Sequence, residues 1–575
     1  MRKLLMILTC IVASIGLSLA QTTRVSGKVV DDTGEGVIGA SVVVKGTTVG
    51  TVTDVDGKFS MNIPSDKKTL VISLLGMKTK EVAAGASLNI LLEDDSRVMD
   101  EVVVTALGIS KEKKALGYAV ADVSGEELSK TRGGLTNPIN ALAGKVAGLQ
   151  INGASGNMGG SSKVLLRGVK SLTGNNQPLF VIDGVPVEGQ DYNSTDTQRG
   201  AGGYDYGNLI QDINPDDVAD ISVLKGPNAS ALYGSRAANG VIMITTKKGT
   251  KGAGLGISVN SSVGFEVVNK FPNLQREYGG GSALTKQAIN GKEYLILDYD
   301  LDESWGPKYD PSTQYVSWYD LAKWEAGGKV GDPTTSAWVA PKHDAKDFFE
   351  TGTSFTNNIS LSKATDVSSV RVSYTNMSVN GYIPNSKLDK NSFNVAGSIK
   401  DNKYYELFTN VTFLNQAATG RPETGYGDNN VMVKFVQWGQ RQLDMKQLKD
   451  LYIMPDGTQA GWNRVAWNDP TMAYSNNPYW SRYKNYQNDT RDRLYGNVGI
   501  KVNILPNLKA QYKANLDYYS DKQYERNAVG SQEESKYSEI ARQQHELNHE
   551  FLLMYNGRFN DKITLDANAG GNIMY

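Results

Sequence analysis

Few residues in this chain have the chemistry that a covalent catalyst or a metal site needs. The 575-residue sequence contains one cysteine, Cys10, and three histidines, His343, His545 and His549. His545 and His549 are four residues apart, a spacing that would place two metal ligands on one face of a helix, but a solvated loop entering a strand is the simpler interpretation. No motif assembles a nucleophile, a base and a metal. We therefore expect no enzyme activity, no metal site and no cofactor.

Two further motifs resemble ligand sites, and both are incomplete. The stretch Asp54-Val55-Asp56-Gly57 begins like a calcium loop, but the later ligands and the closing glutamate are absent, so it predicts an Asp-Gly turn. Gly226-Pro227 and Gly234-Ser235 invite a phosphate-loop interpretation, but no Gly-Lys-Ser/Thr signature follows. Lysine and arginine total 60 and aspartate and glutamate 61, so the charge balance does not indicate nucleic acid as a partner.

The N-terminus has the features of a secretory signal. Two basic residues precede an apolar run over 4–19, and the run ends in small residues, so we expect cleavage between Ala20 and Gln21. The run is short for a transmembrane helix, and no basic stop follows it. Cys10 lies inside this signal, so the exported chain would form no disulfide. No later run of about 18 apolar residues occurs, which leaves a soluble protein or a membrane β-barrel.

Apolar and polar residues alternate strictly in many segments of region 251–575, as in 508–518, where leucine, alanine and tyrosine alternate with lysine, glutamine, asparagine and aspartate. Such segments run about ten residues or more, which is long for a soluble sheet and suits a tilted membrane crossing. We expect nine strands, at 257–267, 353–363, 368–378, 391–400, 403–415, 491–504, 507–519, 549–560 and 562–575.

The connections between these strands alternate between tight turns and long loops. The long ones span 268–352, 379–390, 416–490 and 520–548. This alternation is typical of an outer-membrane barrel, with short periplasmic turns and long extracellular loops. The tryptophans lie in or beside the long loops, where they could stack on sugar rings, grip peptides or pack loop against loop. They are Trp305, Trp318, Trp324, Trp338, Trp438, Trp462, Trp467 and Trp480.

The N-terminal part of the exported chain has three further regions. Residues 21–94 contain short alternating strands separated by turn residues, which predicts a small β-sandwich. Residues 95–109 form a polar linker around Val102-Val103-Val104, whose β-branched side chains favour an extended backbone. This segment is either a strand of the sandwich or a segment that a partner adds to its own sheet. Residues 110–250 predict a mixed α/β domain.

That α/β domain contains two expected helices that begin with a capping asparagine and a proline, over 137–142 and 213–219. Expected strands lie at 164–168, at 179–186 with a turn at Asp-Gly, at 221–227 and at 240–246, with a short helix over 229–233.

Motifs in this α/β region resemble those of a known family. They lie at 137–149, 179–186, 205–217 and 223–242, and the residues we single out are Arg167, Gly168, Asp183, Gly184, Pro186, Lys225, Gly226, Pro227, Tyr233, Gly234, Arg236, Asn239 and Gly240. With them the chain resembles SusC/RagA-type TonB-dependent outer-membrane transporters of Bacteroidota. The implied domains are a signal peptide (1–20), a carboxypeptidase-regulatory-like sandwich (21–94), a linker with the TonB box (95–109), a plug (110–250) and the N-terminal part of a transmembrane barrel (251–575).

The resemblance implies active import of a nutrient, an oligosaccharide (glycan) or a peptide. Substrate would bind beneath a SusD-like surface lipoprotein, and the plug would move when TonB, powered by the inner-membrane proton-motive complex, pulls on the TonB box. The sandwich, box and plug would face the periplasm, the long loops the cell exterior, and the barrel the outer-membrane lipid. The TonB box would be Asp100, Glu101, Val102, Val103, Val104 and Thr105. A surface binding or adhesion receptor without transport is the alternative, and no residue is assigned to substrate.

The chain departs from this family in its number of strands. Related transporters have about 22 strands, and a nine-stranded sheet would leave two unpaired edges in lipid. We therefore expect the sequence to be the N-terminal portion of a longer protein, or a truncated and non-functional transporter.

Overall fold

A computed structural model describes residues 22–575, apart from 32–33, 48, 65–68, 75–76, 94–101, 105–109, 113–119, 131–136, 154–155, 173–174, 188, 190–192, 226–232, 252–253, 402 and 561–562. The chain divides into two compact units, Met1–Val103 with Glu112–Ala115 and Val104–Lys111 with Leu116–Tyr575. The protein is mainly β, as predicted. None of the described helices is long and apolar enough to cross a membrane.

The first unit contains the predicted β-sandwich. Its sheets have the strand orders β4-β1-β7 and β3-β2-β5-β6, and side chains such as Val29, Val42 and Ile72 form the core. The Asp54 side chain accepts the N–H groups of Asp56 and Lys58, which confirms the predicted turn. The strands are β1 (Thr22–Val30), β2 (Ser41–Val44), β3 (Gly50–Val52), β4 (Lys58–Pro64), β5 (Thr69–Ser73), β6 (Lys80–Ala83) and β7 (Leu88–Leu91).

The valine triplet forms a strand outside both sheets of the sandwich. It is β8 (Val102–Val104), and it forms a separate two-stranded sheet with β9 (Ser110–Glu112). The extended backbone is therefore as predicted, and the sandwich-strand interpretation is wrong. The other predicted TonB-box residues, Asp100, Glu101 and Thr105, lie outside the described residues, as do Ala20 and Gln21 at the expected cleavage site.

The plug is built on a five-stranded sheet with the order β10-β15-β16-β13-β14 and an additional hairpin, β11–β12. β13 runs parallel to β16, and the other neighbours in the sheet are antiparallel. Aliphatic side chains are buried on both faces, with Ile182, Ile221 and Ile244 on one face and Val181 and Met243 on the other. The strands are β10 (Val120–Ser124), β11 (Leu149–Gly153), β12 (Ser162–Leu166), β13 (Leu179–Ile182), β14 (Val185–Val187), β15 (Val218–Leu224) and β16 (Val241–Thr246).

The expected plug helices are short. Asn137 caps a single 3-10 turn, and Asn214 caps another. The prediction of a helix over 213–219 is wrong beyond that turn, because β15 begins at Val218 and pairs with β16. The expected helix over 229–233 lies outside the described residues except for Tyr233. The described helices of this domain are α2 (Gly125–Lys130), α3 (Thr195–Arg199), η3 (Pro138–Leu142), η4 (Leu209–Asp212), η5 (Pro215–Asp217) and η7 (Gly234–Ala237).

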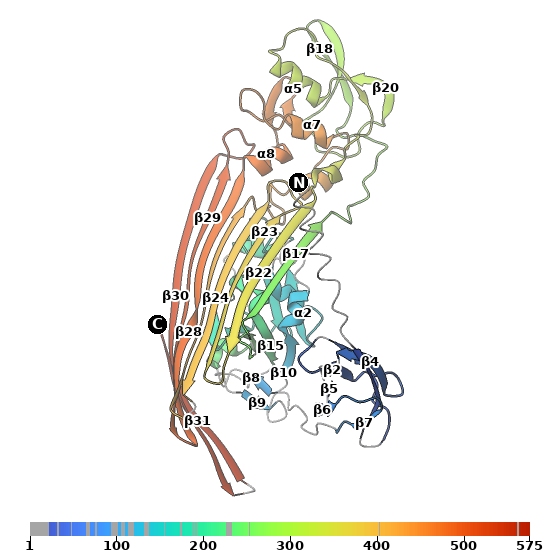
Figure 1. The fold of residues 1–575 in the computed structure, drawn as a ribbon. Helices are drawn as coiled ribbons and strands as arrows, with labels where there is room; N and C mark the ends of the chain where they lie inside the picture. Colours follow the sequence, from blue (N-terminus) through green and yellow to red (C-terminus); the bar gives the residue numbers. More distant parts are fainter. Residues whose placement is uncertain are drawn as a thin grey trace, which may run out of the picture. The chain divides into compact units, whose positions relative to one another are not determined.

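A nine-stranded antiparallel sheet follows the plug in sequence, and all nine predicted strands are present (Figure 1). We call this sheet the barrel wall. Its neighbours pair in sequence order once the loop strands are set aside. The strands are β17 (Gly256–Glu266), β22 (Gly352–Ala364), β23 (Ser368–Asn380), β24 (Lys387–Asp401), β25 (Tyr405–Thr419), β28 (Tyr486–Leu505), β29 (Leu508–Asn527), β30 (Lys536–Asn560) and β31 (Ile563–Met574).

Several wall strands are longer than predicted, and two predicted long loops are therefore too long. β23 ends at Asn380 and β24 begins at Lys387, so the connection expected over 379–390 covers only 381–386. β29 continues to Asn527 and β30 begins at Lys536, so the connection expected over 520–548 covers only 528–535. The two strands pair continuously to Asn527 opposite Lys536. The added segments are rich in charged and amide residues, which interrupt the alternation of apolar and polar residues. The strands nevertheless continue there, because their backbones remain paired.

The two faces of the barrel wall differ in polarity. Ile359, Tyr374, Phe393 and Phe413 lie opposite one another on neighbouring strands, and all four are exposed. The opposite face carries buried polar side chains, of which Asn394 is an example. An apolar outer face and a polar inner face are the arrangement of a membrane barrel.

The two longest connections, 267–351 and 420–485, fold together into what we call the loop domain, drawn beyond the wall strands with α5, α7 and α8 (Figure 1). Its core contains Trp318, Trp338 and Trp462, so loop packing is the confirmed interpretation for these three. Its elements are β18 (Leu284–Ile289), β19 (Lys292–Leu297), β20 (Asp310–Tyr315), β21 (Ser336–Trp338), β26 (Arg464–Ala466), β27 (Asp469–Met472), α5 (Trp318–Ala326), α6 (Val431–Val436), α7 (Met445–Asp450), α8 (Pro478–Tyr483) and η8 (Ala345–Phe348).

The remaining tryptophans divide between packed and exposed positions. Trp324 and Trp467 pack against the loop-domain core, and Trp480 is buried. Trp305 and Trp438 are 70% and 37% exposed, so these two keep a surface that a ligand could contact.

Candidate functional site: the plug and the wall that holds it

The Asp183–Gly184 turn connects the plug to the barrel wall. Ile182 pairs with Val185, and both turn residues have positive φ angles, 48° and 81°, which defines a two-residue type I′ hairpin loop. The Asp183 carboxylate accepts the N–H of Thr246 at 3.0 Å and its hydroxyl at 2.7 Å. It also accepts a hydrogen bond from the amide of Asn410 on β25. One turn therefore joins β13, β16 and the wall.

Other residues of the predicted plug motif have structural positions that explain their type. Arg167 and Gly168 both have positive φ angles, at 62° and 84°. Pro186 lies in the edge strand β14, where a missing N–H is tolerated. Gly240 has a φ of 96°, and a Cβ atom there would lie 2.9 Å from the carbonyl oxygen of Leu224, so this position favours glycine.

The end of the motif reaches the wall through one ion pair. Arg236 Nη1 lies 2.9 Å from Glu546 Oε1 on β30. Gly234, with φ 68°, begins η7, and Asn239 donates to the carbonyl of Asn175 at 2.7 Å. Tyr233 packs against the small core around Leu179, and Lys225 follows β15. Gly226 and Pro227 lie outside the described residues.

A buried network of charges attaches η4 of the plug to the wall. Asp212 has no exposed side-chain surface, and it lies 3.5 Å from Arg491 and 3.1 Å from Arg493, both on β28. Each arginine has a second acid on β29, Asp521 at 3.1 Å for Arg491 and Asp517 at 2.8 Å for Arg493. Alternate residues of one strand point to one face, so both guanidinium groups point inward.

The neighbouring plug turn is attached by a second polar cluster. Arg371 on β23 lies 2.7 Å from Asp217, and Asn214 donates to the hydroxyl of Thr375 at 2.8 Å. On β24, Lys390 donates to the carbonyl of Gln211. Plug segment 205–217 is thus held by side chains from at least three wall strands.

This plug–wall attachment consists largely of ion pairs and hydrogen bonds between buried groups. A buried ion pair contributes little net stability, but removing one partner is costly because the other charge is left unpaired. When the plug moves, water or a neighbouring polar group can take the place of each broken hydrogen bond or ion pair in turn. Side chains interlocked in an apolar core cannot separate in this stepwise way. The geometry therefore suits a domain that is firmly seated yet removable.

A cavity of about 480 Å³ lies between the plug, the loops and the wall, and Tyr204, Tyr206, Glu423 and Glu525 are among its lining residues. The Tyr206 hydroxyl donates to Glu525 Oε1 at 2.8 Å, and burial raises the pKa of Tyr206. Glu423 accepts N–H groups from Gly203 and Asn429, and burial raises the pKa of its carboxyl.

Arg421 couples this cavity to the charge network. It pairs with Asp489 on β28, donates to the carbonyl of Asp205 at 3.0 Å, and lies 5.8 Å from the centre of the Tyr206 ring. A ligand in the cavity would therefore contact the same plug segment that the ion pairs hold.

The histidines form no shared site. His545 and His549 lie in strand β30, not in a helix, so the helical spacing is wrong for this segment. Residues four apart in a strand are separated by about 13 Å. His549 is 2.8 Å from the Tyr512 hydroxyl, and His343 lies 3.1 Å from Asp444. The described residues contain no group of three or more potential metal ligands.

Sequence reasoning located the plug but missed the wall residues that hold it. Arg491 and Arg493 were detectable in principle, because they occupy the polar face of an alternating strand, and in a barrel that face points inward. Their acidic partner in the plug was not detectable, because Asp212 is 279 residues from Arg491 in the sequence.

Two family models match the chain. The CarboxypepD_reg-like domain matches residues 25–104, and the TonB-dependent Receptor Plug Domain matches residues 112–241. The first match contains the sandwich and ends with β8, and the second contains the plug sheet to the start of β16.

Relatives and solved structures agree with these models. The TonB-dependent receptor SusC of Bacteroides thetaiotaomicron is 37% identical over 319 residues, which cover 55% of this chain and 29% of that receptor. The TonB-dependent receptor P26 of Formosa agariphila is 36% identical over 41% of this chain and 22% of its own length. A chain of the RagAB peptide importer in the open-open state has a TM-score of 0.61 at 19% identity, over 82% of this chain and 49% of that one.

The chain thus spans about half the length of the RagAB chain, and its match covers less than a third of SusC. Within that span, two domain models, the relatives and a shared fold all agree. The chain is thus similar to SusC-type TonB-dependent receptors over the part of their length that it matches, and it contains the plug domain of TonB-dependent receptors.

Proposed function

We propose that the protein imports an oligosaccharide or a peptide across the outer membrane when TonB pulls on residues 100–105. The observation that carries this proposal is the polar attachment of plug segment 205–217 inside the barrel wall, next to a cavity that a substrate could occupy. The relation to SusC and the RagAB-like fold support a SusD-like lipoprotein as partner at the outer face.

The plug topology suggests how a pull would act. β10 is the first plug strand after β8 and β9, and among the described strands it lies at the edge of the plug sheet and pairs with β15 alone. An edge strand can be separated from its neighbour one hydrogen bond at a time. β15 directly follows the turn that contains Asp217. A force that displaces β15 would therefore next pull on the ion pair between Asp217 and Arg371.

Extended TonB-box residues suit recognition by strand addition, in which backbone hydrogen bonds to a partner sheet provide the affinity. In this mechanism the chain forms and breaks no covalent bond. Its residues bind substrate, seal the pore and release the seal. The sandwich, box and plug face the periplasm, and the loop domain faces the cell exterior.

The test is deletion of residues 100–105 in the full-length receptor. We expect uptake, and growth on the transported nutrient, to be lost while the amount of receptor in the outer membrane stays the same. Val103→Pro should have the same effect, because proline removes a backbone N–H and fixes φ. Val103→Ile, which keeps an extended β-branched residue, is the matched control. Continued uptake after the deletion would exclude coupling through this segment.

A further inference from the structure

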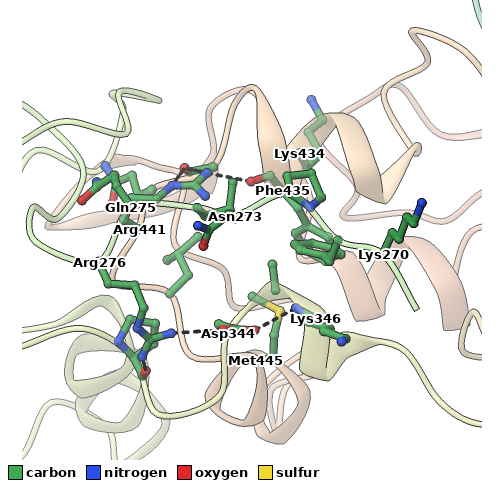
Figure 2. Close-up of a pocket in the computed structure, with 18 of the residues that line it drawn as sticks. Lys270, Asn273, Gln275, Arg276, Asp344, Lys346, Lys434, Phe435, Arg441 and Met445 are labelled. Atoms are coloured by element: carbon green, nitrogen blue, oxygen red, sulfur yellow. Dashed lines mark hydrogen bonds and ion pairs between the residues drawn. The ribbon is translucent and has the colours of Figure 1, made fainter. Parts of the chain in front are cut away.

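The loop domain contains a cavity of about 520 Å³ that is separate from the cavity lined by Tyr204 and Tyr206. Three segments line it: the chain after β17, the turn that leads into η8, and the stretch from α6 to α7 (Figure 2). Its volume lies within the range of small-molecule sites. The second and third segments contribute to the loop-domain core, and Phe271 of the first lies edge-on to Phe349 with ring centres 6.1 Å apart, so the cavity is part of a folded domain.

The lining is strongly basic although the chain as a whole is nearly neutral. It contains one acidic residue, Asp344, whose carboxylate lies 3.0 Å from Arg276 Nη1. In the part of the chain that the structure describes, three of the lining cations have no ion-pair partner within 4 Å: Lys270, Lys346 and Arg441. All the cationic lining residues are Lys270, Arg276, Lys346, Lys434 and Arg441.

Arg441 is held in a fixed orientation by backbone groups. Its Nη2 atom donates to the carbonyls of Phe435 and Gly439, each at 2.6 Å, and its Nε atom donates to Gly439 at 3.2 Å (Figure 2). Among the described residues no acceptor bonds to Nη1. Burial lowers the pKa of Arg441, because it removes hydration from the charged guanidinium. A half-buried guanidinium with a free donor is well suited to bind an anion.

The rest of the lining fits a polar ligand with an apolar face. The side-chain amides of Asn269 and Asn273 are exposed and form no hydrogen bond within the described chain. Phe271 also lines the cavity and is partly exposed, whereas Phe435 is buried in the loop-domain core. Free amides match the hydroxyl groups of a sugar, and an aromatic ring matches the apolar face of a pyranose.

We propose that this cavity binds an acidic sugar, a uronic-acid unit of an oligosaccharide, with Arg441 on its carboxylate and Lys270 and Lys434 nearby. The inference rests on the proposed function, because it names the substrate class for the imported nutrient. A binding measurement alone tests this inference. A receptor that binds no acidic sugar could still import another nutrient, and a receptor that binds the sugar could still fail to import it.

The probe is trigalacturonic acid, titrated by calorimetry into the full-length receptor purified in detergent. We expect binding that weakens as salt is raised, because screening reduces charge attraction. The neutral methyl ester of the same sugar should bind at least about tenfold more weakly. Arg441→Gln and Lys270→Gln should each weaken binding of the acid by about tenfold or more. Lys270 is exposed, so its replacement does not threaten folding.

Lys286→Gln is the matched control, because Lys286 is an exposed lysine of the loop domain outside the cavity lining. It should bind trigalacturonic acid as the unchanged protein does. Equal binding of the acid and its methyl ester, or unchanged binding by both cavity variants, would overturn the proposal. Tetraglutamate is a third probe, and tighter binding of this peptide than of the sugar would reassign the cavity to acidic peptides and overturn it also.

Discussion

Asp212 shows how single side chains connect the plug to the barrel wall. It accepts contacts from two arginines of one strand, and each arginine is also paired with an acid of the next strand. The result is a network of two arginines and three carboxylates, in which the plug supplies one of the carboxylates. Removing that carboxylate would leave each wall arginine with a partner on β29 but would remove one of the contacts that hold the plug.

We expect Asp212→Asn to loosen the plug while leaving the receptor in the outer membrane. Because each arginine keeps an acidic partner on β29, the cost should lie below the about 3–5 kcal/mol of a fully unpaired buried charge. Amide hydrogen exchange of segment 205–217 in the full-length receptor should therefore accelerate by about tenfold or more. Glu126→Gln is the control, since the Glu126 side chain is exposed and its carboxylate lies 2.8 Å from Lys130 at the surface. Unchanged exchange in Asp212→Asn would show that other contacts hold the plug.

Strands of the barrel wall place polar and apolar residues on opposite faces, and neighbouring strands keep the same register. Tyr374, Phe393 and Phe413 form one row across three strands on the exposed face. Buried Asn394, next in sequence to Phe393, faces inward and donates to Thr412 at 2.9 Å. A row of aromatic side chains on an exposed face would be unfavourable in water and is favourable against lipid.

Replacement of Phe393 tests whether this face contacts lipid. Phe393 lies near the middle of β24, where an arginine in the bilayer costs about 2–4 kcal/mol. We expect Phe393→Arg to reduce the fraction of receptor that assembles in the outer membrane, measured by its resistance to unfolding in detergent on a gel. Phe393→Leu should assemble normally, because it remains apolar. Normal assembly of the arginine variant would contradict a lipid-facing position.

At the scale of the whole molecule, the plug and the wall form one mechanical unit. Contacts run from the η4 region at β28 to η7, where Arg236 meets Glu546 on β30. The exported chain would contain no native cysteine, since Cys10 is the only one and lies in the expected signal. Introduced cysteine pairs would therefore react without competition.

Cross-linking the plug to the wall tests whether transport requires plug movement. In Arg236→Cys/Glu546→Cys, a short bis-maleimide should join η7 to β30, because both positions are partly exposed at their side chains. We expect uptake to fall in proportion to the cross-linked fraction. The two single-cysteine variants, treated with the same reagent, provide the control and should transport normally. Full transport by cross-linked receptor would mean that this part of the plug does not need to leave the wall.

The sequence by itself determined features that depend on near neighbours along the chain. Strand alternation assigns each residue to a face locally, so all nine wall strands were predictable from 251–575. The turns at Asp54–Gly57 and Asp183–Gly184 were predictable because aspartate and glycine have specific backbone preferences. The extended backbone of Val102–Val104 followed from its β-branched side chains.

Only the tertiary structure decided which polar groups meet. Charged residues that extend β28 and β29 interrupt the apolar pattern, so these strands were predicted too short, and backbone pairing completes them. Trp318 and Trp462 do not belong to a periodic pattern of apolar residues that would predict their burial. They are buried because two distant loops fold against each other. Asp212 and Arg491 are far apart in the sequence and become neighbours only in the folded chain, so no local sequence pattern predicts their contact. The same holds for the cations around the loop-domain cavity.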